Sequence, residues 1–373
     1  MTIINSLGVP LRPLAPESSW LFNWTTGETW AAPPPIPVST FVEFERYTKQ
    51  WNDVYGSYAN TTYTESVPDD LTISTYDWLS RENYPQLQGR FTEALTAWGY
   101  GDTREIPIFY ALRALSPAAL AERIYLVDYH EVFQRYADQL VNATIHLGSR
   151  IGKIDRSESH ATIHYSIHGD PNNPLSVQTC SDVIIAFPPT PESLHHAGLE
   201  LSPAESTVFS AVRTVNYFST AVKLNTPRLS AFAVATESPK ISADMAGEPV
   251  LILSMYNTSD ISLAYPMARH DQSVDEVRET TLQTLSRINR DPKLDEDNTD
   301  STPVQETDIK TFRHHPDYFP HFSGEALRGG WYAKFNRLQG WNRTYYTSGL
   351  NRAEHVEYAV LAARELVEAH FST

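Results

Sequence analysis

The sequence has little cysteine, little positive charge and no long apolar segment. Cys180 is its single cysteine in 373 residues, so no disulfide can form within the chain. Lysine and arginine number 29 against 45 aspartates and glutamates, and the formal net charge is −16. Binding to phosphate backbones needs basic surfaces, so we expect no nucleic acid and no anionic membrane surface as a partner. No apolar run approaches the length of a membrane span, so we expect no membrane-spanning helix.

The glycine pattern of a dinucleotide site is also absent. That motif is a strand, then Gly-X-Gly-X-X-Gly, then a helix. Gly99-Tyr100-Gly101 lacks the third glycine and follows no apolar strand, and residues 1–11 hold one glycine. The sequence therefore contains no recognisable turn that would place a pyrophosphate on a helix end.

Metal and hydrolase chemistry find no support in the residue spacing. His314, His315, His321 and Asp317 fit no standard zinc pattern, and the chain has one thiol. Ser348 does not stand in a Gly-X-Ser-X-Gly elbow. We predict no metal site and no hydrolase triad, and we expect these histidines at the surface or in a substrate pocket.

The composition is that of a globular protein, with 41% hydrophobic and 12% aromatic residues. The length suits one large or two ordinary domains. Apolar residues at helical or alternating spacing predict the main elements. We expect helices over 39–58, 75–79, 90–98, 106–115, 127–140, 205–212 and 273–288, a hairpin over 20–30, and strands over 161–167, 183–187, 217–224, 230–236 and 249–256.

The C-terminal region predicts a strand, a small-residue turn and a helix start. Residues 344–347 are β-formers, and Ser348 with Gly349 ends the strand. Asn351 is expected to cap the helix, with Glu354 as its capping-box partner. Such a turn directs free backbone N–H groups and a positive helix end at an anion or a polar cofactor edge.

A second apolar strand is predicted before two prolines. The run from Val183 to Phe187 is continuously apolar, and Pro188 and Pro189 stop it. Strands of this kind are covered on both faces in parallel sheets, and we expect the same here.

These segments resemble a known family. Gly329-Gly330-Trp331-Tyr332, Leu338-Gln339-Gly340 and Tyr345-Tyr346-Thr347-Ser348-Gly349 resemble the C-terminal flavin-binding segment of the flavin-containing amine oxidase superfamily. The similarity is greatest to the fungal branch of FAD-dependent oxidoreductases that includes β-cyclopiazonate dehydrogenase. The block from 151 to 189 resembles a second segment of that family, and the two occur in the family's order.

The resemblance implies FAD as the cofactor. It implies that Ser348, Gly349, His355 and Val356 lie against the flavin ring, and that the backbone near Ile151 contacts the adenine. It makes Trp331 and Tyr332 an aromatic wall of the substrate pocket, with ordinary core packing as the alternative. It identifies no catalytic acid or base.

The resemblance also implies the fold class, which is α/β with α and β mixed. An incomplete Rossmann-like FAD-binding domain would carry an inserted substrate domain of helices and an antiparallel sheet. We expect residues 1–140 to be mainly helical substrate domain, 141–190 and 325–373 to be FAD-binding segments, and 191–324 to be substrate domain.

The implied function is oxidation of a small, largely apolar or aromatic metabolite in secondary metabolism. Three explanations of the absent glycine motif stay open. The sequence is truncated, a partner polypeptide supplies the module, or the chain is a cofactor-free remnant that acts as a binding protein or as a non-redox isomerase or cyclase. We expect a soluble protein without a visible signal peptide. Five glycosylation sequons make a secretory origin conceivable: Asn23, Asn60, Asn142, Asn257 and Asn342.

Overall fold

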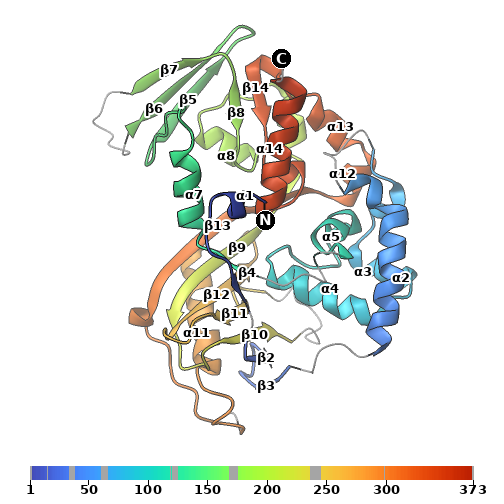
Figure 1. Cartoon of the computed structure of the whole chain (residues 1–373), viewed down its shortest axis with the longest axis vertical. Helices are drawn as coiled ribbons and strands as arrows, with labels where there is room; N and C mark the ends of the chain where they lie inside the picture. The colour runs from blue at the N-terminus through green and yellow to red at the C-terminus, as the bar shows by residue number, and fades with distance from the viewer. Residues whose placement is uncertain are drawn as a thin grey trace.

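The structure is a computed structural model with mixed α/β architecture (Figure 1). It describes residues 2–14, 16–32, 38–59, 66–117, 119, 125–167, 175–235, 245–297 and 299–371. Figure 1 shows three regions: a large sheet at the bottom, a group of helices at the right, and smaller sheets with the C-terminal helix at the top.

The large sheet has seven strands in the order β13-β9-β12-β11-β10-β2-β3. Its strands are β2 (Ser18–Phe22), β3 (Thr29–Ala31), β9 (Val212–Lys223), β10 (Ser230–Val234), β11 (Pro249–Ser254), β12 (Ile261–Ala268) and β13 (Ile309–Phe322). All pairs are antiparallel except β10 with β2. Helix α11 (Val274–Ile288) packs on β11 and β12, and an apolar cluster fills the space between them. The predicted hairpin is confirmed as β2 and β3.

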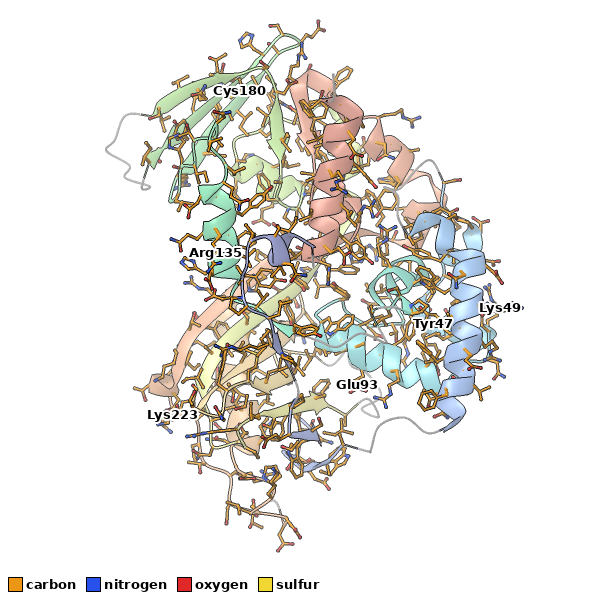
Figure 2. The ribbon with its side chains drawn as sticks, viewed as in Figure 1. Tyr47, Lys49, Glu93, Arg135, Cys180 and Lys223 are labelled. Atoms are coloured by element: carbon orange, nitrogen blue, oxygen red, sulfur yellow. The ribbon has the colours of Figure 1, made fainter. Side chains whose placement is uncertain are left out.

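The helical region is formed by α2 (Val38–Val54), α3 (Thr75–Arg81), α4 (Pro85–Ala97) and α5 (Ile108–Ala114). These four helices confirm the predicted helical periodicity. Figure 2 shows Tyr47 of α2 directed toward α4 and α5, whereas Lys49 two residues on points away. Tyr47 is fully buried, and its hydroxyl donates to the carbonyl oxygen of Leu115 at 2.6 Å.

Two further sheets lie at the top. Strands β5 (Arg150–Arg156), β6 (Ala161–Ser166) and β7 (Ser176–Cys180) form an antiparallel sheet, and β8 (Val183–Ile185) pairs in parallel with β14 (Thr344–Tyr346). Helices α8 (Pro191–His196), α9 (Pro203–Phe209), α12 (Gly324–Arg328), α13 (Trp331–Asn336) and α14 (Val356–His370) surround them. A short pair, β1 (Arg12–Pro13) and β4 (Tyr125–Leu126), with α1 (Thr2–Ser6) and α7 (Tyr129–Asp138), completes the described elements used below.

The expectation that the 183–187 strand is covered on both faces is wrong in part. Val183 and Ile185 are buried, but Ile184 between them is 45% exposed. Successive side chains alternate between the two faces of a strand, so Val183 and Ile185 lie on the covered face and Ile184 lies on the other.

No helix within the described ranges is both long and apolar enough to cross a membrane. Of the sequon asparagines, Asn142 and Asn257 are exposed, and Asn23 accepts hydrogen bonds from the backbone N–H groups of Thr25 and Thr26 in the β2–β3 turn. Asn60 lies outside the described residues.

Candidate functional site

Two segments far apart in the sequence meet in the β8–β14 pair. Thr344 lies opposite Val183, and Tyr346 lies opposite Ile185. The backbone N–H of Thr347 extends the pairing by donating to the carbonyl oxygen of Ile185 at 2.9 Å. The residues that follow β14 therefore start at the carboxyl end of a parallel strand, where α/β sheets commonly bind their ligands.

A buried ion pair fixes β14 to the neighbouring sheet. Arg156 at the end of β5 holds both carboxylate oxygens of Glu205, at 2.6 and 3.0 Å. The Tyr346 hydroxyl donates to the same carboxylate at 2.7 Å. Burial opposes ionisation, but the hydrogen bonds from Arg156 and Tyr346 lower the pKa of Glu205. The carboxylate therefore joins β5, α9 and β14 as one unit.

The turn after β14 differs from the predicted cap. Ser348, not Asn351, is the capping residue, and it precedes a short 3-10 helix over Gly349–Asn351. The Ser348 backbone N–H donates to the Asn351 side chain at 2.8 Å, and the Leu350 N–H donates to Ser348 Oγ at 3.2 Å. The reciprocal pattern leaves Glu354 outside the cap, because the helix it was expected to start begins only at Val356.

The start of α14 exposes two of the residues expected at the flavin. His355 caps the helix, and its Nδ1 accepts from the Glu357 N–H at 3.3 Å. Val356 is 41% exposed. Behind them the buried Arg352 forms an ion pair with Glu365 of α14, which holds the loop under the helix.

Of the expected aromatic wall, Tyr332 lies in the core. Its hydroxyl donates to the carbonyl oxygen of Leu350 at 3.1 Å and lies 2.9 Å from the Tyr110 hydroxyl. Tyr332 therefore supports the turn from behind. Trp331 is half-buried, and Lys334 Nζ lies 3.4 Å from the centre of its ring.

Ile151 lies on β5 and pairs with Tyr165 of β6. Its side chain is half-buried and packs against the same apolar cluster that contains Ile185, Tyr346 and Leu350. The structure thus gathers Ser348, Gly349, His355 and Val356 in one segment and places Ile151 in the adjoining sheet.

Four tyrosines form a stack beside this segment, which we call the tyrosine column: Tyr100, Tyr318, Tyr217 and Tyr265. Ring centroids are 6.2 Å apart for the first pair, 4.7 Å for the second and 6.1 Å for the third. Tyr100 follows α4, and the other three come from β13, β9 and β12. Gly99 permits this contact, because its φ is +76° and a Cβ there would lie 2.6 Å from the Tyr217 ring.

Glu354 joins the turn to the tyrosine column. The Tyr100 hydroxyl donates to the Glu354 carbonyl oxygen at 2.9 Å. The Glu354 side chain lies over Gly349, where an added Cβ would be 2.1 Å from Oε2. Burial raises the pKa of the Glu354 carboxyl to about 7.

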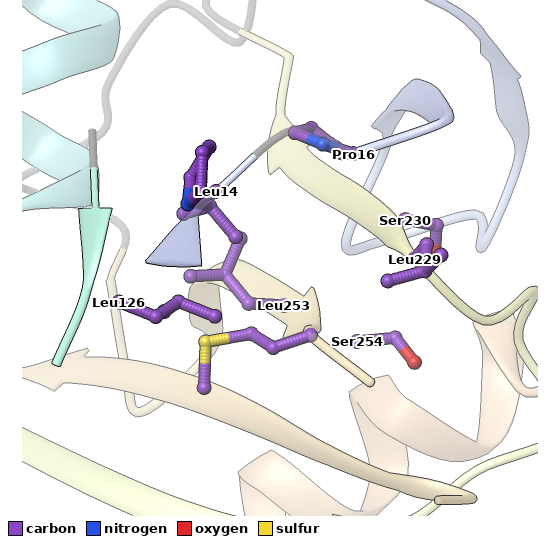
Figure 3. Close-up of a pocket in the computed structure, with 9 residues that line it drawn as sticks. Leu14, Pro16, Leu126, Leu229, Ser230, Leu253 and Ser254 are labelled. Atoms are coloured by element: carbon purple, nitrogen blue, oxygen red, sulfur yellow. The ribbon is translucent and has the colours of Figure 1, made fainter. Parts of the chain in front are cut away.

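Figure 3 shows a separate apolar cavity of about 40 Å³ at the end of β10 and β11. Leu14, Leu126 and Leu253 line it together with Ser230 and Ser254. It lies under the β1–β4 pair, and its lining includes none of the residues of the turn or the tyrosine column. Among the described residues, no group of three or more His, Cys, Asp and Glu side chains is placed to hold a metal ion.

No protein-family profile matches the chain. An uncharacterized protein of Acanthamoeba polyphaga mimivirus is 26% identical over 314 residues, which cover 78% of this chain and 60% of that protein. The FAD-dependent oxidoreductase oblC of Cochliobolus heterostrophus is 24% identical over 372 residues, which cover 92% of this chain and 72% of that protein. The matched region thus spans 60% of the length of the mimiviral relative.

Solved structures match over nearly the whole chain. The CLA-producing fatty acid isomerase from P. acnes has a TM-score of 0.78 at 18% identity, over 100% of this chain and 84% of its own. Putrescine oxidase bound to putrescine has a TM-score of 0.61 at 16% identity, and the match covers 99% of this chain and 84% of putrescine oxidase. Cyclohexylamine oxidase from Brevibacterium oxydans has a TM-score of 0.59 at 13% identity, and the match covers 99% of this chain and 83% of that oxidase. The chain has the fold of the flavin amine oxidases.

The amine oxidase fold confirms the family resemblance and the α/β class. Two features of the site were missed by sequence reasoning: the tyrosine column and the buried carboxyl of Glu354. A repeated aromatic spacing would not have shown the column, because its members come from four separate elements. Glu354 looked like a helix cap, and only its burial distinguishes it.

Proposed function

We propose that the chain acts as an FAD-dependent oxidoreductase of the amine oxidase type. Its substrate would be a small, largely apolar or aromatic metabolite of secondary metabolism. The observation that carries this proposal is the parallel pairing of β8 with β14, which delivers Ser348 and Gly349 to the carboxyl end of the strands beside the tyrosine column.

The residues present fit a flavin. The turn from Ser348 to Val356 offers polar backbone groups and a helix start, which suit the polar edge of an isoalloxazine. Gly349 lets the Glu354 carboxyl lie against its backbone, and the buried Oε2 of that carboxyl has no hydrogen-bond partner among the described residues. A flavin supplies the hydride-accepting chemistry when it is bound.

The chain's own residues would bind and orient the substrate. The tyrosine column presents aromatic faces that are stacked and largely dry, and such faces hold planar or apolar ligands. Burial raises the pKa of Tyr100, Tyr217 and Tyr318, so their phenols stay neutral and serve as walls and hydrogen-bond donors.

The test of this proposal is flavin retention. The purified chain is mixed with FAD, passed through gel filtration, and its visible absorbance is recorded. We expect flavin absorbance to elute with the protein, and to be lost in Gly349→Val but kept in the matched Gly89→Ala, since a Cβ on Gly89 meets nothing within 4 Å. A folded wild-type chain that retains no flavin at saturating FAD, either alone or with the partner polypeptide described below, contradicts the proposal.

We further propose that a partner polypeptide completes the β8–β14 sheet. The outer edge of β14 is already satisfied, because Gln339 donates to the Tyr346 carbonyl at 3.0 Å and accepts from its N–H at 2.9 Å. The outer edge of β8 pairs with no strand in the described part of the chain. Parallel sheets are normally buried and larger than two strands, so β8 is the edge to which another strand would add.

The surface beside β8 supports the same partner. Ile184 is 45% exposed, and Val356 and Val360 of α14 are 41% and 39% exposed. Ala363, one turn further on the same stripe, is also exposed. A parallel strand with a packed helix would cover both features, and a glycine-rich turn between them would supply the pyrophosphate site that this sequence lacks.

The partner proposal is tested with a polypeptide that carries such a strand, turn and helix. We expect it to co-elute with the wild-type chain and to tighten FAD binding by 10-fold or more, on the order of 1.4 kcal/mol. Val360→Glu should abolish co-elution, and the matched Val274→Glu on α11, also exposed, should not. Self-association of the chain through this face, or no complex at all, contradicts it.

A second function is favoured by one observation. The P. acnes fatty acid isomerase gives a TM-score of 0.78, whereas the two oxidases above give 0.61 and 0.59. Isomerisation of an unsaturated fatty acid would leave the substrate mass unchanged. Chromatography with mass detection after incubation separates the two functions, since an oxidase product loses two hydrogens.

A further inference from the structure

Glu354 is a half-buried residue whose carboxyl lies against the Gly349 turn. Oε2 of Glu354 is shielded from solvent and has no hydrogen-bond partner among the described residues. Unsatisfied buried carboxyl oxygens are costly, and natural structures keep few of them. By contrast Glu205, a fully buried carboxylate of the same region, is held by Arg156, Tyr346 and the Ser202 backbone.

The groups around Glu354 do not neutralise it. The phenols of Tyr100 and Tyr318 face it, but they donate to the carbonyl oxygens of Glu354 itself and of Trp98. Two arginines of the region have other partners: Arg352 pairs with Glu365, and Arg113 donates to Tyr55. On its own segment, His355 and Glu357 are exposed, and Tyr358 donates to the Arg113 carbonyl. A Cβ placed on Gly349 would lie 2.1 Å from Oε2 and 3.2 Å from a ring carbon of Pro320.

We propose that Glu354 is the acid–base group of the site, and that it exchanges a proton with an uncharged ligand that binds beside the Gly349 turn and the tyrosine column. This inference rests on the proposed function of that site. The ligand class follows from the surroundings: aromatic faces bind an apolar or aromatic body, and the carboxyl binds an O–H, N–H or carbonyl group on it.

The exchange is balanced within the pair. In one direction the O–H bond of neutral Glu354 breaks, its electron pair stays on Oε2, and the proton bonds to a ligand oxygen or nitrogen. In the reverse direction the carboxylate takes the proton of a ligand O–H or N–H. Burial raises the pKa of Glu354 to about 7, so both forms are populated at neutral pH, which suits proton transfer in either direction.

Infrared titration of the full chain tests the group directly. The wild type should show a protonated carboxyl band that disappears with a midpoint near pH 7. Glu354→Gln should lack this band, and Glu357→Gln, an exposed glutamate three residues on, should keep it. A wild-type chain with no carboxyl band above pH 6 overturns the proposal.

Ligand coupling is measured with p-cresol, an uncharged aromatic with one hydroxyl. Saturating p-cresol should move the midpoint of the carboxyl band by about one pH unit, which is a tenfold change in proton affinity. In Glu354→Gln, p-cresol should produce no carboxyl band and no midpoint. An unchanged midpoint overturns the proposal. Flavin retention is scored separately on the same samples, so loss of FAD binding with a p-cresol shift removes the oxidoreductase function and leaves the acid–base group standing.

Discussion

The hydroxyl of Tyr346 donates a hydrogen bond of 2.7 Å to Oε1 of Glu205, and both side chains are fully buried. Arg156 holds the same carboxylate, so three segments that are distant in the sequence share one anion. This contact decides how the strand before the candidate flavin turn is positioned. The same contact therefore contributes to the stability of the chain and to the geometry of the site.

Replacing Tyr346 by phenylalanine should destabilise the chain. The variant removes one hydrogen bond to a buried charged group and leaves the ring packing in place, so we expect a loss of about 1.5–3 kcal/mol in the free energy of unfolding. Urea denaturation measures it. Tyr256→Phe is the matched control, since Tyr256 is 44% exposed, and it should change stability by less than about 0.5 kcal/mol. Equal losses in the two variants would show that the hydrogen bond contributes nothing.

Replacing Gly349 by alanine should displace the Glu354 carboxyl. The added Cβ would lie 2.1 Å from Oε2, so the side chain must turn away from its buried position. We expect the infrared midpoint of the carboxyl to fall from about 7 toward its ordinary value of 4.5. Gly89→Ala, where the Cβ meets open space in the middle of α4, should leave the midpoint unchanged and stabilise the helix by roughly 0.5–1 kcal/mol. A midpoint that stays near 7 in Gly349→Ala contradicts the packing described.

Stability relative to Glu354→Gln should fall as the pH rises. The folded pKa of Glu354 is about 7 and its ordinary value is 4.5, so between these values the folded state keeps a proton that the unfolded state has lost. The stabilising proton is fully effective below pH 4.5 and ineffective above 7. The free energy of unfolding of the wild type minus that of Glu354→Gln should fall across this window, from low to high pH, by roughly 3 kcal/mol at most. Urea midpoints at pH 4.5, 6 and 7.5 measure it, and a flat difference refutes the raised pKa.

His321 should act in the opposite direction. Burial lowers the pKa of His321 from its ordinary 6.5 to about 4. Between pH 4 and pH 6.5 the imidazole is therefore protonated in the unfolded state and neutral in the folded state. Stability is fully present above pH 6.5 and is lost as the pH falls toward 4. The wild type should lose stability relative to His321→Gln across this window, and His196→Gln, which replaces an exposed histidine and keeps His321, should follow the wild-type profile. Parallel profiles for His321→Gln and the wild type would refute it.

Local patterns in the sequence predicted local structure well. The hairpin over 20–30, the helices α2 to α5 and the strands of 344–347 and 183–187 all followed from periodicity and turn residues. The sequence did not predict that the last two pair with each other, as they do in the structure. The long strand β13 was missed, because its histidines and prolines are poor strand formers and it is held by pairing with β9.

The site was predicted as a segment but not as a chemical arrangement. Ser348 and Gly349 were recognised as a turn, yet the cap was assigned to Asn351 and Glu354, because Glu354 stands three residues after Asn351 as in a capping box. In the structure the reciprocal cap joins Ser348 to Asn351. Tyr100 and Tyr318, whose phenols face Glu354, come from other elements. Such proximity is set by the fold and leaves no mark in the neighbouring residues.

The central claim is that the segment from Ser348 to Val356 binds a flavin. The most direct test is equilibrium dialysis of the folded chain against FAD, with and without the partner polypeptide defined above, followed by visible absorbance. The account predicts one FAD per chain with the partner, weaker binding by the chain alone, and loss of binding in Gly349→Val. A folded chain that binds no FAD in either condition would contradict it.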